Sequence, residues 1–150
     1  CSWEQPQSWC RLGLFHSAYS NSFVSMNLFD PKTDRPKLQA LIGDEAEELV
    51  YKFCVIDRQQ LENMVLCSGR IDPEGYAMKH IRTGEKIQVS AREATAFIVE
   101  TMADYVDQSF GWQTSLETGF AGALWPGIAK PTNRLSKISL FAAAVRTSGH

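Results

Sequence analysis

The chain has 150 residues, 44% of them hydrophobic and 21% charged, and its formal net charge at pH 7 is −2. This composition predicts one globular domain over residues 1–150 and excludes a disordered polypeptide. A slightly acidic chain has no bulk attraction for nucleic acid, so we expect no nucleic-acid partner. No apolar run approaches the 18 residues typical of a transmembrane helix, which predicts a soluble protein without a membrane span.

The cysteines argue against a zinc knuckle, because their spacings of 9, 44 and 13 residues contain no CxxC pair. Cys54 falls on an apolar helical stripe and is expected to be a small buried hydrophobic residue. We expect a reduced, intracellular chain, with a disulfide scaffold as the alternative.

Three helices are predicted in the first third of the chain, over residues 7–17, 36–42 and 44–56. The first is apolar on both faces, since Leu14 and Phe15 lie opposite Trp9 and Leu12, and we expect it to be central and buried. The third has apolar residues at the i, i+3, i+4, i+7 and i+8 positions. Its early acids at 44–48 favour a solvated helix start that matches the helix dipole, with a metal site as the alternative.

Residues 57–89 are the least helical part, and we expect a small β-hairpin there with its turn at 83–85. A capping box from Ser90 to Glu93 then predicts a long helix to about Phe110. Gly111 is expected to end this helix and to place Trp112 in a loop. A last helix is predicted over 133–145. The fold class is therefore mainly α, a helical bundle with a small hairpin.

Two polar residues point toward the predicted core. Asp104 follows Phe97 by seven residues and therefore lies on nearly the same face of its helix, and His16 has the same relation to Trp9. A buried carboxylate must be hydrogen-bonded, paired or metal-bound, because an isolated one is very costly. Both a pair of locally hydrogen-bonded core residues and a shared metal or active site remain open.

Residues 14–17, around His16, and residues 103–108, around Asp104, resemble two helical segments of the HD superfamily of metal-dependent phosphohydrolases and related oxygenases. More closely, the chain is similar to an uncharacterised HD-like family found in bacteria, plants and algae. The matching stretches are residues 13–19, residues 41–47, Ala103 and Asp104 with Gln108, and residues 125–127.

The resemblance implies an HD-like helical bundle in which His16 and Asp104 are metal ligands, for iron, manganese or zinc if the site is intact. The chain departs from the superfamily pattern at Ser17, which stands where an acid is expected, and the earlier histidine ligand is missing. We therefore expect an upstream helix to precede this chain, and a metal site that is incomplete and holds no cofactor.

The expected function is that of a non-catalytic or degenerate HD-like domain, a binding or accessory subunit with protein partners. The occurrence of the family in plants and algae suggests a large organellar assembly, such as one in the chloroplast. The alternative is a metal-dependent phosphohydrolase, or an iron-dependent oxygenase, of the same superfamily.

Four further residues are candidates for contacts with a substrate or partner. Tyr19 lies near His16, Arg58 follows a helix end, and Lys79 precedes His80 in the predicted hairpin. The basic cluster around His80 fits either an anionic ligand or a solvated surface. Trp112 could anchor a partner, or it could cap the bundle.

Overall fold

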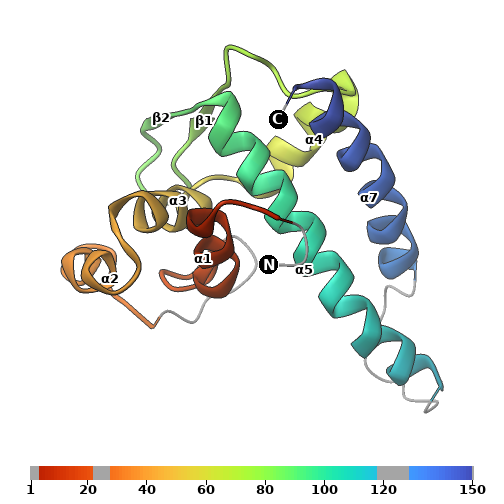
Figure 1. Cartoon of the computed structure of the whole chain (residues 1–150), viewed down its shortest axis with the longest axis horizontal. Coiled ribbons are helices and arrows are strands. Elements are labelled where there is room, and N and C mark those ends of the chain that lie inside the picture. Colours follow the sequence, from red (N-terminus) through yellow and green to blue (C-terminus); the bar gives the residue numbers. More distant parts are fainter. Residues whose placement is uncertain (1–3, 22–27, 118–128, 150) are drawn as a thin grey trace.

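The computed structural model describes residues 4–21, 28–117 and 129–149. Within these ranges, it describes the side chains of all residues except 109–117 and 129–135. Helix α5 (Ala91–Glu117) runs through the middle of the molecule (Figure 1). Helices α1 (Gln7–Phe15), α2 (Arg35–Ile42) and α3 (Asp44–Val55) lie on one side of it. Helices α4 (Arg58–Ser68) and α7 (Ala129–Thr147) lie on the other, and α7 packs on both α4 and α5.

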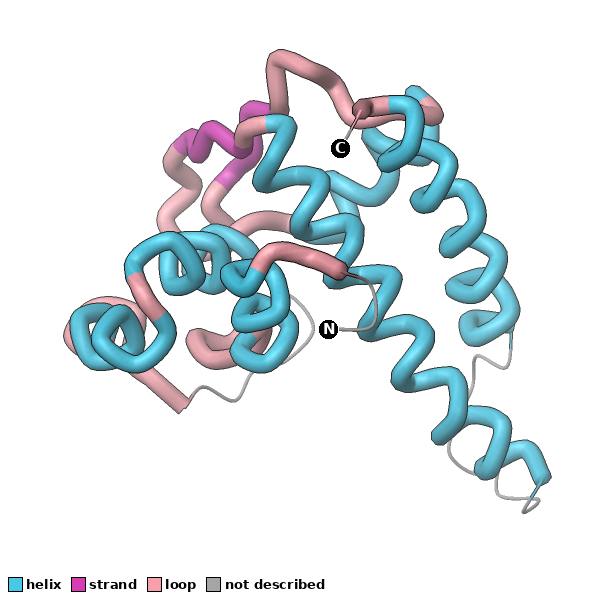
Figure 2. The backbone as a smooth tube through the Cα atoms, viewed as in Figure 1, coloured by secondary structure: helices cyan, strands magenta, loops and turns pink. Residues whose placement is uncertain are grey.

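The described part of the chain is mainly helical, with one small antiparallel sheet (Figure 2). Strand β1 (Tyr76–Lys79) pairs with β2 (Lys86–Val89) in the register Tyr76 to Val89, which confirms the predicted hairpin. Tyr76 and Met78 alternate inward along β1 and are buried. In the described residues, no helix has the length and apolarity that a membrane crossing requires.

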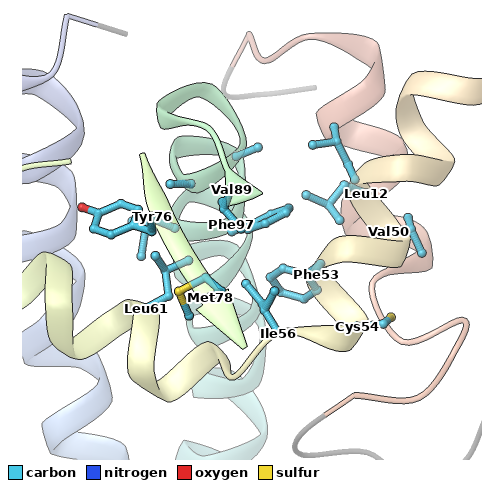
Figure 3. Packing of buried hydrophobic residues seen from close by; sticks show 14 of the residues in the cluster. Leu12, Val50, Phe53, Cys54, Ile56, Leu61, Tyr76, Met78, Val89 and Phe97 are labelled. Carbon is cyan, nitrogen blue, oxygen red and sulfur yellow. The ribbon is translucent and has the colours of Figure 1, made fainter. Parts of the chain in front are cut away.

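The core forms where α3 packs against α5 and the hairpin. The predicted apolar stripe of α3 is confirmed, because its five residues are all buried. They are Ala46, Leu49, Val50, Phe53 and Cys54. Figure 3 shows Phe53 and Ile56 near Phe97 of α5, and the rings of Phe53 and Phe97 have centroids 5.4 Å apart. The inward stripe of α5 is likewise buried from Ala94 to Tyr105.

The predicted start of α5 is confirmed in detail. The main-chain N–H of Ser90 donates to Glu93 Oε2 at 2.8 Å, and the main-chain N–H of Glu93 donates back to Ser90 Oγ at 3.3 Å. Two orphan donors at the helix start are thereby satisfied. The predicted end was wrong, because α5 continues through Gly111 and Trp112 to Glu117. Glycine costs a helix interior only about 1 kcal/mol, which the tertiary context can override.

Helix α4 was missed by the sequence analysis, although its ends carry ordinary signals. The Asp57 side chain accepts a hydrogen bond from the main-chain N–H of Gln60 at 3.2 Å, as an N-cap does. Leu61 and Val65 are buried one turn apart, and Gly69 ends the helix in the left-handed conformation. The apolar stripe is narrow, which is why the segment resembled a short irregular stretch.

Two expectations about the first helices were also wrong. Helix α1 lies at an edge of the bundle, and its Leu14 is 81% exposed. Glu47, expected in the solvated start of α3, is completely buried. Its carboxylate accepts hydrogen bonds from Arg35 Nε and Nη2, both at 2.8 Å, and from the Tyr19 hydroxyl at 2.7 Å. Long-range donors of this kind are what make the burial of a carboxylate tolerable.

Two glycines with positive φ offer a matched test of the turns. Gly75 has φ of 74°, and a Cβ atom there would lie 2.2 Å from the carbonyl oxygen of Val89. Gly69 has φ of 67° with no atom within 4 Å of such a Cβ. We expect Gly69→Ala to lower the free energy of unfolding by about 1 kcal/mol through backbone strain alone. Gly75→Ala should lower it by about 3 kcal/mol or more, because a main-chain clash is added.

Urea unfolding of the two variants beside the parent measures both free energies. Equal losses in the two variants would contradict the packing described for the hairpin.

Candidate functional site

A pocket of about 630 Å³ opens between α1 and α5. Apolar side chains form much of its wall, among them Trp9, Leu14 and Val99. Besides the Gln5 amide and the Cys10 thiol, its polar groups are those of one histidine and three acids. They are His16, Glu100, Asp104 and Asp107. Both residues that the sequence analysis singled out as inward-facing, His16 and Asp104, therefore line the same pocket.

The imidazole of His16 is fixed by its own helix and by α5. Its Nδ1 lies 2.8 Å from the carbonyl oxygen of Gly13, which can only accept, so Nδ1 carries a proton. The same nitrogen lies 3.2 Å from Glu100 Oε1. Because a Cβ on Gly13 would lie only 2.9 Å from Glu100 Oε2, the glycine permits this close approach of the two helices. The Cys54 thiol donates to the His16 carbonyl at 3.2 Å, and this hydrogen bond anchors the main chain of His16 to α3.

Asp104 lies one helical turn beyond Glu100 and is held from other directions. Its Oδ1 accepts a hydrogen bond from Gln108 Nε2 at 2.7 Å, and its Oδ2 lies 3.8 Å from Arg58 Nη2. The Arg58 guanidinium is 4% exposed and stacks 4.3 Å above the ring of Phe53. Arg58 thus approaches Asp104 from the core side of α5.

The two buried tyrosine hydroxyls nearest in sequence to the pocket residues each donate to an acid other than Asp104. The Tyr105 hydroxyl donates to Glu62, at 3.1 Å and 3.0 Å to its two oxygens, and the Tyr19 hydroxyl donates to Glu47.

Glu100 is the acid that the sequence analysis missed. It is 7% exposed and lies between Phe97, three residues before it, and Asp104, four residues after it, on the inward face of α5. Burial raises the pKa of Glu100 to about 7, Asp104 adds to the rise, and His16 and Arg58 oppose it. The spacing to Asp104 was the signal that could have revealed a pair of acids on one helix face.

Tyr19 and Lys79 do not line this pocket. Tyr19 is fully buried, and Lys79 lines a separate pocket together with Asp57 and His80. His80 is buried as well, and its Nδ1 accepts the main-chain N–H groups of Arg82 and Thr83 at 3.1 and 3.2 Å. Burial lowers the pKa of His80, so it is a neutral structural residue. The side chain of Trp112 lies outside the described residues.

The described side chains do not bring three or more histidine, cysteine, aspartate or glutamate residues together as a metal-binding group. The three cysteines in the described residues, Cys10, Cys54 and Cys67, carry free thiols.

Residues 1–58 of the chain match a domain of unknown function, DUF6817. The matched segment contains His16 and the Arg35–Glu47 pair, whereas Glu100 and Asp104 lie beyond it. No curated protein and no solved structure matches the chain.

The raised pKa of Glu100 predicts a particular dependence of stability on pH. Because the pKa is about 7 in the folded chain and ordinarily 4.5, the stability that the neutral carboxyl contributes is fully present below pH 4.5. It is lost as the pH rises through 7. We expect Glu100→Gln to flatten this loss and to raise the free energy of unfolding at pH 8 by about 1–3 kcal/mol.

Urea unfolding at several pH values between 4 and 8 tests this. Glu74→Gln, which changes an exposed acid of the loop before β1, is the matched control and should leave the profile unchanged. A Glu100→Gln profile parallel to that of the parent would show that Glu100 ionises normally.

Proposed function

We propose that this chain is a binding domain of the HD-like type, an accessory subunit without catalytic activity, and that it binds its ligand in the pocket between α1 and α5. The observation that carries the proposal is the composition of this pocket. Its volume of about 630 Å³ falls in the range of small-molecule sites, and apolar walls surround a few converging polar groups.

The positions of two residues support the HD-like part of the proposal. His16 follows the last residue of α1, and Asp104 lies on the long helix α5, as the resemblance to the HD superfamily implies. Both line one pocket, and Glu100 contacts the first and interacts electrostatically with the second. An HD-like arrangement is expected to bring such distant residues together. Glu100, however, is an acid on α5 at a position that the superfamily pattern does not predict.

The charge beside Asp104 argues against a catalytic metal in this pocket. Catalytic zinc is usually held by three protein ligands with an open position for water. The contact of His16 Nδ1 with the Gly13 carbonyl is neutral on this point, because Nε2 is the nitrogen that would ligate a metal. The guanidinium of Arg58 lies 3.8 Å from Asp104 Oδ2. A permanent cation beside one ligand disfavours a divalent ion there. The residues present therefore do not fit a metal-dependent phosphohydrolase, which is the alternative function.

The accessory role implies a protein partner, and a place in a chloroplast assembly rests on the resemblance alone. The exposed side chain of Leu14 at the pocket rim is compatible with contact to such a partner. A large apolar residue on a surface beside a pocket often belongs to an interaction site.

Substitution of Asp104 distinguishes the proposed binding domain from the alternative, a metal-dependent phosphohydrolase. We expect the purified chain to contain no stoichiometric iron, manganese or zinc and to show no hydrolysis of p-nitrophenyl phosphate in the presence of Mn²⁺. Asp104→Asn should leave the metal content unchanged. It should lower the free energy of unfolding by about 1–3 kcal/mol, because the pairing with Arg58 is lost.

Elemental analysis, a hydrolysis assay and urea unfolding provide the three measurements. Asp107→Asn is the control for stability, since Asp107 is an exposed acid on the same helix, and its effect should stay within about 0.5 kcal/mol. About one equivalent of metal in the parent, lost in Asp104→Asn, would overturn the proposal in favour of the enzyme.

A further inference from the structure

Three glutamates are buried in the described part of the chain, and two of them are fully provided with hydrogen-bond donors. Glu47 accepts four hydrogen bonds, from Tyr19, twice from Arg35, and from Gln39. Glu62 accepts from the Tyr105 hydroxyl and from Lys137 Nζ, the latter at 3.2 Å. Both carboxylates therefore follow the rule that a buried charge is paired and hydrogen-bonded.

Glu100 is the exception among these three. Within the described residues, its polar contact is the 3.2 Å approach of His16 Nδ1 to Oε1, and that nitrogen already donates to Gly13 at 2.8 Å. In the same part of the chain, Glu100 Oε2 accepts no hydrogen bond from a protein donor, and it is not fully enclosed, so it is open to a group in the pocket. The residue is 7% exposed, and it lines the pocket between α1 and α5. A carboxylate with this burial lacks a donor that a ligand in the pocket can supply.

The charges and walls of the pocket define which donor fits. Glu100, Asp104 and Asp107 are acidic, and the basic group in the lining is that of His16. Arg58 offsets the charge of Asp104 from the core side, so Glu100 and Asp107 are the acids whose charge favours a cation in the pocket. Trp9, Leu14 and Val99 offer an apolar surface that a hydrated metal ion would leave unused, whereas the face of Trp9 also attracts an organic cation.

We propose that the pocket between α1 and α5 binds a small organic amine, whose ammonium group donates to Glu100 while its apolar body packs on Trp9, Leu14 and Val99. The inference rests on the proposed function and adds the chemical class of the ligand to it. Asp107 contributes charge near the ammonium, and the donated hydrogen bonds give Glu100 the partners that Glu47 and Glu62 obtain from the protein.

An NMR titration of the ¹⁵N-labelled chain with 2-phenylethylamine tests the proposal. We expect saturable shifts of the main-chain amides of Gly13, Val99 and Ala103, with a Kd on the order of 1 mM for so small a probe. The neutral analogue 2-phenylethanol should bind at least about tenfold more weakly, because it lacks the charge. Glu100→Gln should weaken binding of the amine by about tenfold, whereas Glu74→Gln, outside the pocket, should leave it unchanged.

Three results would overturn the inference: no saturable shifts with the amine, equal binding of the amine and the alcohol, or unchanged binding to Glu100→Gln in a variant whose spectrum shows it to be folded. Displacement of the amine by stoichiometric Mn²⁺ would overturn it too, because the site would then be a metal site. If the amine fails to bind while hydrolysis and bound metal stay absent, the inference alone fails. Hydrolysis that depends on metal would overturn the proposed function itself.

Discussion

The arrangement of the first three helices depends on the hydrogen bonds that the buried carboxylate of Glu47 accepts. This carboxylate receives the Arg35 guanidinium from α2, the Gln39 amide from the same helix, and the Tyr19 hydroxyl from the turn after α1. Burial alone would raise the pKa of Glu47, but the hydrogen bonds from Arg35 and Tyr19 outweigh it and hold that pKa below its usual value. Removing the Arg35 guanidinium would leave the charge of Glu47 buried without its cation, so the pair fixes α2 to α3.

This network lies outside the pocket and still determines one of its walls. Tyr19 follows His16 by three residues, so the position of its hydroxyl constrains where α1 ends. The Cys54 thiol holds the same turn through the His16 carbonyl. On the other wall, Arg58 positions Asp104 while it packs on Phe53 at the centre of the core. The polar groups of the pocket are therefore oriented by residues that a ligand does not touch.

Features that depend on neighbours in sequence could be predicted, and those that depend on distant partners could not. The stripe of α3, the hairpin and the capping box at Ser90 are local, and all three are confirmed. The burial of Glu47 depends on Arg35, twelve residues away and on another helix, and nothing in the sequence around Glu47 announces it.

The candidate site shows the same division. The inward direction of Asp104 follows from helical spacing, and Glu100 was within reach of the same reasoning, because it lies four residues earlier on the same face. The pairing of Asp104 with Arg58, 46 residues away, and the contact of His16 with Glu100 across two helices need the fold itself.

The capping box at Ser90 sets the helical phase of everything that follows it on α5. Glu100 and Asp104 lie ten and fourteen residues further on, about 15 and 21 Å along the helix axis. With the start fixed at Ser90, one inserted residue between 90 and 100 would turn the rest of the helix by about 100°. Val99 and Ala103 would then occupy the places of the two acids. The wall that α5 contributes to the pocket would become almost wholly apolar, although the chain would still contain every acid. The charge of the pocket therefore depends on the number of residues between the cap and the acids.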